Sequence, residues 1–296
     1  MNTDKTLLFI GAHPDDETFG PGATLAHYAS RGVNVYYVCA TGGESGTVNA
    51  IYLQEYASVK HLRHTELKCA AEELGLSGLY FLGYRDSGMP GSPDNNHPQS
   101  LNMALLSNVV SNLVRIIRDI KPQVVLTHGP HGDYGHPDHI MVHKATITAF
   151  KAAGDISLYP DCGQPFQPQK LYYNTFSHRM LKLMIKFMPL LGRNPRRFGR
   201  NHDIDLTAIV NQTMPVTTVI KLDRRALKRQ RRAASCHQSQ IEGTSLRRLA
   251  TAILNRFGKQ EEFFTLALPS RYDQFPENDL FQGIKILNPD PWETKE

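Results

Sequence analysis

The sequence predicts an α/β protein with a Rossmann-like parallel sheet that helices cover on both faces. Short apolar, β-branched segments alternate with longer amphipathic ones over the first 155 residues, as in parallel sheets with helical crossovers. With 296 residues, 41% of them hydrophobic and 21% charged, the chain has the composition of an ordinary globular protein. We expect its C-terminal part to complete the crevice of the sheet.

The first predicted strand is the apolar run 7–10, after which Gly11 lets the backbone turn. A short helix follows at 23–30, or from Thr18 onward in a second interpretation, and the β-branched run 33–39 predicts the next strand. The later elements of the core alternate in the same way: helix 52–74 ending at Gly75, strand 79–82, helix 101–120, strand 124–127, and helix 137–152 with proline in its first turn.

The alternation weakens beyond Gly154. The remaining predicted elements are strands at 170–176, 216–222 and 263–268, helices at 223–235 and 244–257, and an irregular tail at 269–296. We divide the chain into a Rossmann-like catalytic core at 1–155, a variable basic insertion at 156–215, and a C-terminal part at 216–296 that packs on the core.

Positive charge is concentrated in one region. Residues 162–232 hold 15 Lys/Arg against three Asp/Glu, although the net charge of the chain is only +5. Within this region, 178–201 mixes basic and apolar residues, which fits a lid, a surface that contacts an anionic membrane, or a solvated insertion. We expect no nucleic-acid partner, because a basic patch alone is only an electrostatic footprint.

The four cysteines form no CxxC pair and no short repeated spacing. This argues against a zinc knuckle or a disulfide framework and favours a reducing compartment, and Cys39 fits a small core residue of a strand. No stretch approaches the roughly 20 apolar residues of a membrane span, and the N-terminus lacks the pattern of a signal peptide. We therefore expect a cytoplasmic protein, with the oligomeric state left open and a homo-oligomer among the alternatives.

Two stretches carry most of the residues that can bind a metal or move a proton. The first strand leads into His13, Asp15, Asp16 and Glu17, and such a carboxylate-rich turn is costly to desolvate without a cation. The fourth strand leads into 127–139, which holds four histidines and two aspartates. In the usual doubly wound order, strands one and four are neighbours at the switch point where ligand crevices form.

A three-ligand metal site follows from these residues. His13 and Asp16 form a His-x-x-Asp turn, and one distant histidine would complete a set with an open fourth position, as in catalytic zinc sites. His136 and His139 have the spacing that turns two side chains the same way at a helix start. The mixed N/O donors suit Zn²⁺, with Fe²⁺, cobalt and manganese as alternatives.

Each of these residues also has a purely structural interpretation. The acidic turn could be a helix N-cap, and His136 and His139 a polar helix start. For His128 and His131 we favour solvated loop histidines. The others could be structural as follows: Arg63 and Glu66 as a surface ion pair, Asp86 as a turn residue, and His237 as a cap of the basic helix.

AHPDDE near the N-terminus and YGHPDH about 120 residues later resemble motifs of the PIG-L/LmbE-like family of zinc-dependent N-deacetylases. RHTE from Arg63, FLGYRDSGM from Phe81 and CHQSQ from Cys236 extend the resemblance, which covers 7–150 well. It implies His13, Asp16 and His139 as metal ligands. It also implies a metal that lowers the pKa of a water molecule and polarises the amide carbonyl.

The resemblance further assigns roles to catalytic side chains. Asp15 would be the general base, His136 the electrophile or general acid, and Tyr134 a hydrogen-bond donor to the oxyanion. Asp138 would lie behind His136 and fix its tautomer. The remaining candidates, which would contact the sugar or shape the site, are Arg63, Glu66, Asp86 and His237.

The predicted function is metal-dependent removal of an N-acetyl group from an N-acetylglucosamine conjugate, which releases acetate and a free amine. One alternative is an amidase for a larger amide such as a thiol-sugar conjugate. The other is a sugar-binding protein without chemistry, which the base Asp15 argues against. GAHPDD replaces GxGxxG after the first strand, so we expect no dinucleotide.

Overall fold

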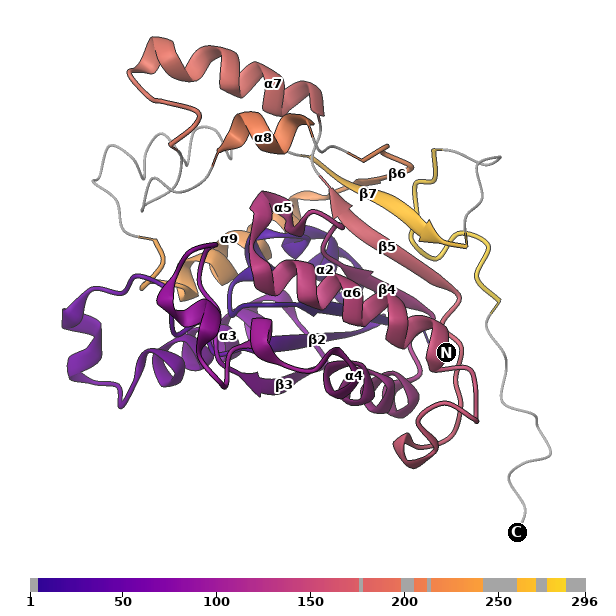
Figure 1. Cartoon of the computed structure of the whole chain (residues 1–296). Helices are drawn as coiled ribbons and strands as arrows, with labels where there is room; N and C mark the ends of the chain where they lie inside the picture. Colours follow the sequence, from indigo (N-terminus) through magenta and orange to yellow (C-terminus); the bar gives the residue numbers. More distant parts are fainter. Residues whose placement is uncertain are drawn as a thin grey trace.

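One sheet of seven strands organises the part of the chain that the computed structural model describes, namely residues 5–175, 178–197, 205–211, 214–241, 260–269 and 276–285 (Figure 1). The strand order is β3-β2-β1-β4-β5-β7-β6. Their bounds are β1 Thr6–Gly11, β2 Asn34–Thr41, β3 Gly78–Tyr84, β4 Val124–Thr127, β5 Lys170–Thr175, β6 Thr218–Lys221 and β7 Glu261–Leu268.

The first five strands form the predicted parallel, doubly wound sheet. β1 pairs with both β2 and β4, so the polar loops after β1 and β4 emerge side by side at the switch point. The other edge adds two antiparallel pairs to the predicted parallel sheet, because β7 runs antiparallel to β5 and β6 antiparallel to β7. Helices do connect these strands, because α7 (His178–Phe187) and α8 (Leu206–Asn211) lie between β5 and β6, and α9 (Arg224–Cys236) lies between β6 and β7. The alternation of strands and helices along the chain therefore does not reveal the antiparallel direction of this edge.

Successive residues of β1 point to opposite faces, and each face has its own apolar core. Leu8 and Ile10 pack with α4 (Leu106–Ile120) and α6 (Pro137–Ala152), whereas Leu7 and Phe9 pack with α2 (Gly22–Ala29) and α3 (Val59–Leu74). All six residues of β1 are buried, as the continuous apolar run predicts. Helices therefore cover both faces, as expected (Figure 1).

Two predicted helices are shorter than expected. The segment predicted as helix 52–74 contains a separate 3₁₀ turn, η1 (Ala50–Gln54), and α3 begins only after Ser58, whose hydroxyl accepts a hydrogen bond from the amide of His61. The segment predicted as helix 101–120 is divided by extended backbone at Ala104 and Leu105. The serine that caps α3 marks the true start of this helix, but the apolar periodicity of the segment 52–74 obscures that local signal.

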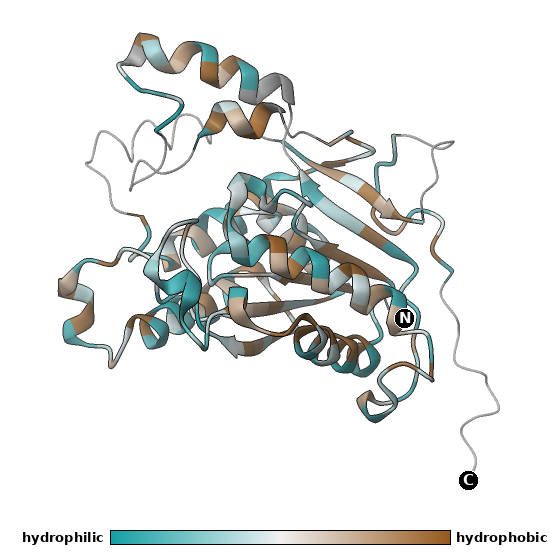
Figure 2. Cartoon of the chain, in the orientation of Figure 1, coloured by the Kyte–Doolittle hydropathy of each residue, from teal (hydrophilic) through white to brown (hydrophobic). Residues whose placement is uncertain are grey.

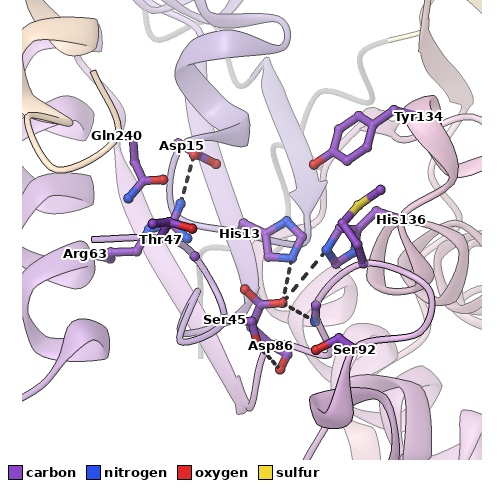
Figure 3. Close-up of a pocket in the computed structure, with 13 residues that line it drawn as sticks. His13, Asp15, Ser45, Thr47, Arg63, Asp86, Ser92, Tyr134, His136 and Gln240 are labelled. Atoms are coloured by element: carbon purple, nitrogen blue, oxygen red, sulfur yellow. Dashed lines mark hydrogen bonds and ion pairs between the residues drawn. The ribbon is translucent and has the colours of Figure 1, made fainter. Parts of the chain in front are cut away.

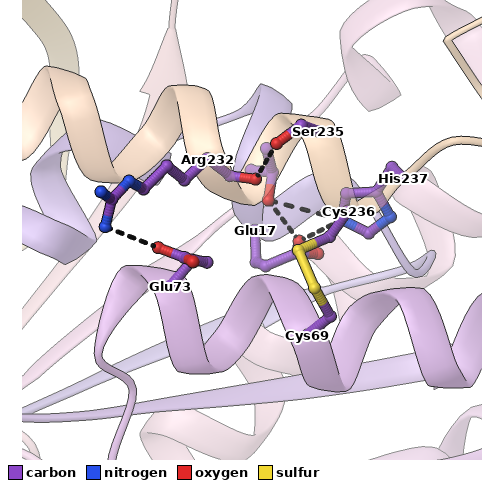
Figure 4. The surroundings of a disulfide bond; sticks show 8 residues. Glu17, Cys69, Glu73, Arg232, Ser235, Cys236 and His237 are labelled. Carbon is purple, nitrogen blue, oxygen red and sulfur yellow. Dashed lines mark hydrogen bonds and ion pairs between the residues drawn. A yellow bond between two sulfur atoms is a disulfide. The ribbon is translucent and has the colours of Figure 1, made fainter.

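The C-terminal helix α9 (Arg224–Cys236) packs against α2 and α3 through small side chains, among them Ala26, Ala70 and Ala233. A disulfide between Cys69 and Cys236 joins α3 to α9 beside these alanines (Figure 4). The prediction that the cysteines form no disulfide is therefore wrong. The two cysteines lie 167 residues apart, and only the packing of α9 on α3 brings their Cα atoms to 5.8 Å.

We expect removal of this disulfide to lower the stability of the fold. A double variant, Cys69→Ser with Cys236→Ser, should lose about 2–4 kcal/mol in the free energy of unfolding, because the crosslink closes a long loop in the unfolded chain. Denaturant unfolding with and without a thiol reductant measures the effect. Reductant should destabilise the natural protein alone, and an equal response of both proteins would contradict this account.

The predicted basic insertion contains α7 (His178–Phe187), η5 (Met188–Leu191) and α8 (Leu206–Asn211), which lie outside the helical layers of the sheet (Figures 1 and 2). The division of the chain at 155 and 215 stays a prediction, although the sheet crosses both boundaries through β5, β6 and β7. The helix predicted at 244–257 lies outside the described residues. In the described parts of the chain, we find no helix with the length and apolarity of a membrane span.

Candidate metal centre and adjoining pocket

The polar loops after β1 and β4 bring the predicted metal ligands together. His13 follows β1, Asp16 begins the short helix α1 (Asp16–Phe19), and His139 lies in the first turn of α6. The Asp16 Oδ2 atom accepts hydrogen bonds from the backbone amides of Ala12 and His13, both at 2.8 Å. These bonds fix the carboxylate, which is not used as an N-cap of α1, so the simple capping interpretation does not hold.

The three side chains have the spacing of a tetrahedral metal site. His13 Nδ1 lies 3.1 Å from His139 Nε2, His139 Nε2 lies 3.6 Å from Asp16 Oδ1, and His13 Nδ1 lies 3.9 Å from Asp16 Oδ2. Zinc bonds of 2.0–2.1 Å at tetrahedral angles would separate two ligand atoms by about 3.3 Å. Both histidines are buried, and the three residues group as a candidate ligand set. This donor set therefore fits a divalent metal.

Carboxylates contact the opposite nitrogen of each histidine. His13 Nε2 lies 3.2 Å from Asp138 Oδ2, and His139 Nδ1 lies 3.0 Å from Asp133 Oδ2. Metal-binding histidines commonly have such partners, which fix the tautomer and raise the basicity of the ligand. Asp133 was not among the predicted site residues. Its positive φ of 61° marks a backbone conformation that few side chains adopt without a structural reason.

His128 is a buried member of this cluster, so its interpretation as a solvated loop histidine is wrong. Its Nδ1 lies 2.6 Å from Asp133 and its Nε2 lies 3.2 Å from Asp16. Burial lowers the pKa of His128, but these two carboxylates outweigh that effect and raise it to about 9. A cationic His128 thus holds both carboxylates in place, whereas His131, in the same loop, is exposed as expected.

We expect Asp133→Asn to weaken metal binding by about 10- to 100-fold, because the amide cannot replace the carboxylate behind His139 and His128. Competition with a chromophoric chelator, using Zn²⁺, measures the affinity. Asp161→Asn, at an exposed aspartate of the 3₁₀ helix η4 (Pro160–Cys162), serves as the control and should bind as tightly as the natural protein. Unchanged affinity in Asp133→Asn would contradict this role.

A cavity of about 410 Å³ opens beside the candidate metal ligands and is lined largely by polar residues (Figure 3). The predicted catalytic residues Asp15, Tyr134 and His136 line it, together with Asp86 and the candidate ligand His13. Helix α3 and loops far apart in the sequence supply the rest of the wall: Arg63 from α3, and Ser45, Gly46, Thr47, Gly88, Met89, Ser92 and Gln240 from the loops.

Asp15 is held at the wall of this pocket by Arg63. Arg63 Nη2 lies 2.8 Å from Asp15 Oδ2 and also donates to the carbonyl oxygen of Pro14 at 2.7 Å. Asp15 has a φ of 146°, a strained conformation of the kind that clusters at active sites. Burial raises the pKa of Asp15 to about 6, against the opposing effect of Arg63. A carboxyl group in that range can accept a proton near neutral pH.

His136 is held as a neutral hydrogen-bond donor toward the pocket. Its Nδ1 accepts a hydrogen bond from the backbone amide of Asp138 at 3.2 Å, which leaves the proton on Nε2. Burial, with the neighbouring His13 and His139, lowers the pKa of His136 to about 2. The structure thus differs from the predicted arrangement, because the backbone of Asp138, not its carboxylate, fixes the tautomer of His136.

The Asp138 carboxylate instead accepts hydrogen bonds from the backbone amide of Ser87 at 2.9 Å and from the Ser87 hydroxyl, which turns it toward His13. Asp86 has the geometry of a turn residue and also lies in the pocket wall, while its contact with a sugar stays a prediction. Its Oδ1 accepts the amide of Gly88, as a turn residue would, and lies 3.6 Å from His13 Nε2 at the pocket wall. The phenol of Tyr134 lies across the pocket from Asp86 (Figure 3).

Two predicted substrate contacts, Glu66 and His237, do not line the pocket. His237 Nε2 lies 2.7 Å from Glu17 Oε1, with both side chains fully buried (Figure 4). Glu66 accepts hydrogen bonds from the amide and hydroxyl of Ser239, both at 2.7 Å. Both residues tie the segment after α9 to the core, and Arg63 and Glu66 form no ion pair with each other.

Sequence reasoning did not identify Asp133, Ser87 and Gln240 as site residues. Asp133 lies inside the second motif, Ser87 follows Asp86, and Gln240 belongs to the CHQSQ stretch, so each had a neighbouring signal. Glu17 was noted as able to move a proton, but its contact with His237 joins residues 220 positions apart. No local spacing reveals such a contact.

Comparison with known proteins agrees with this geometry. Residues 8–150 match the protein family described as PIG-L, GlcNAc-PI de-N-acetylase. A relative from Thermomonospora curvata, named 1D-myo-inositol 2-acetamido-2-deoxy-alpha-D-glucopyranoside deacetylase, is 37% identical over 306 residues, which cover 97% of this chain and 99% of the relative. The chain belongs to the PIG-L family. A relative of the same name from Acidothermus cellulolyticus is 35% identical and covers 96% of both chains.

A solved structure supports the fold of this PIG-L family member. The N,N'-diacetylchitobiose deacetylase of Pyrococcus horikoshii matches with a TM-score of 0.59 at 20% sequence identity. The match covers 88% of this chain and 83% of that one. Because 88% of the chain is more than its first 155 residues, the match extends beyond the core that the family motifs define and includes part of the region after residue 155.

Proposed function

We propose that this chain is a metal-dependent deacetylase that removes the N-acetyl group from an N-acetylglucosamine unit of a small conjugate, with release of acetate and a free amine. The observation that carries the proposal is the pocket in which Asp15, His136 and Tyr134 converge beside His13. The full-length similarity to deacetylases of an acetylated glucosaminyl inositol supports it.

His13, Asp16 and His139 would hold the metal, which when bound lowers the pKa of water and polarises the amide carbonyl. Asp15 accepts the proton of the attacking water, and Arg63 orients its carboxylate. His136, with its proton on Nε2, donates a hydrogen bond to the oxygen on which negative charge develops, and Tyr134 adds a second donor. The proton that Asp15 has accepted then passes to the leaving nitrogen.

The pocket supports a substrate of disaccharide size. Its volume of about 410 Å³ is near the lower end of small-molecule sites, which span roughly 300–1,000 Å³. Polar groups of the lining, such as Ser45, Asp86 and Gln240, suit sugar hydroxyls. We therefore propose the glucosaminyl inositol type of conjugate as the first candidate, with Zn²⁺ as the metal and Fe²⁺ as the alternative.

Acetate release from a panel of N-acetylglucosamine conjugates tests this proposal. The panel contains the α-glycoside of myo-inositol, N,N'-diacetylchitobiose, free N-acetylglucosamine and a thiol-sugar amide, and each is given to metal-stripped enzyme with Zn²⁺ or Fe²⁺ added back. We expect turnover that depends on added metal and is fastest with the inositol glycoside. Turnover without metal would refute the metal-dependent mechanism, and cleavage of the thiol-sugar amide alone would favour an amidase.

The sequence predicts a cytoplasmic location, and we keep this location as part of the proposal. The disulfide between Cys69 and Cys236 is an observation that argues against it. Cytosolic thiols are normally kept reduced. Cys69 is exposed, so the crosslink is accessible to reductants. Alkylation of free thiols at the moment of cell lysis, followed by mass spectrometry, would reveal the state of Cys69 and Cys236. An oxidised pair would favour an oxidising compartment.

A further inference from the structure

One outward face of the α7–η5 segment is apolar although nothing in the described chain covers it. Leu183, Phe187 and Leu190 are 56%, 49% and 78% exposed, and Met184 between them is 41% exposed. Leu183 and Phe187 are four residues apart, so they lie on the same side of the helix. Figure 2 shows the alternation of brown and teal along α7, which stands at the outside of the molecule.

Basic residues border this apolar face. Lys182 and Lys186, also four residues apart, are exposed on the adjoining side of α7, and Arg193 and Arg196 are exposed just beyond η5. The sequence contains no Asp or Glu between residues 162 and 202. The surface therefore combines an apolar centre with a basic border, of which Arg196 lies within electrostatic range of Asp205. This is the pattern of helices that lie at the interface of anionic membranes.

The rest of the segment is anchored to the fold. Met188, Leu206 and Val210 are buried, and α7 packs on α8. The α8 helix in turn contacts α5 (Gly132–Gly135), the turn that carries Asp133 and Tyr134. The apolar face is thus presented by a supported helix on the side of the molecule that holds the candidate metal centre.

We propose that this α7–η5 face binds the surface of an anionic lipid bilayer. Leu183, Phe187 and Leu190 enter the region between headgroups and acyl chains, while Lys182 and Lys186 contact lipid phosphates. The charge pattern favours a bilayer over a second copy of the chain. In a symmetric dimer the same patch meets itself, which would bring the two positive borders together.

Vesicle cosedimentation of the full chain tests the proposal without any substrate, so its outcome is independent of the proposed deacetylase activity. Vesicles of phosphatidylcholine alone are compared with vesicles that contain phosphatidylglycerol, at about 0.1 M and about 0.5 M salt. We expect binding to the anionic vesicles at least about tenfold tighter than to the neutral ones, and weaker at high salt.

Paired variants separate the apolar and charged contributions. Leu183→Ser with Phe187→Ser, and Lys182→Gln with Lys186→Gln, should each weaken binding about tenfold. The matched controls are Ile156→Ser with Leu158→Ser and Lys68→Gln with Lys144→Gln, which change exposed residues elsewhere and should bind like the natural protein. Thermal melts verify that all variants are folded.

Three results would overturn the proposal. The first is no preference for anionic vesicles, and the second is an equal loss of binding in the controls. The third is a dimer in light scattering that the Leu183 and Phe187 changes dissociate, because the apolar face would then be an interface between two copies of this chain.

Discussion

Asp15→Asn is expected to lower kcat by about 10²- to 10⁴-fold, the contribution of a positioned general base, without loss of bound metal. Asparagine keeps the shape of the side chain and can still accept a hydrogen bond from Arg63, but it cannot take a proton from water. It also tolerates the positive φ of residue 15 better than most side chains do.

Acetate release under saturating substrate, together with metal analysis of the same preparation, measures this effect. Asp161→Asn is again the matched control, since it removes one exposed carboxylate that does not line the pocket. If Asp15→Asn loses its metal, the residue is a ligand, and the assignment of Asp15 and Asp16 must be exchanged. If it keeps full turnover, another group is the base.

His139→Ala is expected to abolish stoichiometric metal binding. The natural protein should retain about one metal ion per chain after dialysis, and the variant close to none, since a three-ligand site would be reduced to two ligands. Activity should fall with the metal content, and added Zn²⁺ should restore it only at high concentration.

The exposed His131, eight residues before His139, provides the control for this experiment. His131→Ala should keep both metal and activity, which would show that the loss in His139→Ala does not come from disturbing the loop. Full metal content in His139→Ala would exclude it from the ligand set. Attention would then turn to the neighbouring group of His13, Asp86, His136 and Asp138.

The sequence by itself determined the parallel core and the location of the site. The apolar run before His13 and the run 124–127 are strands as predicted, and helix 137–152 has the predicted bounds. These elements can be predicted from the sequence because their signals are local. The signals are a continuous apolar run for each buried strand, a proline at a helix start, and motifs that directly follow the strands. Strand order then follows from the usual topology of such sheets, which brings the two motifs together.

Only the tertiary structure decided which polar groups meet. Cys69 with Cys236, Glu66 with Ser239, and Glu17 with His237 are pairs more than 160 residues apart, made when α9 docks on α2 and α3. In the same way, His128 is buried because its loop folds over Asp16. The antiparallel edge formed by β7 and β6 also depends on contacts distant in the chain. Periodicity and motif spacing report local geometry, whereas these contacts arise from the packing of whole elements.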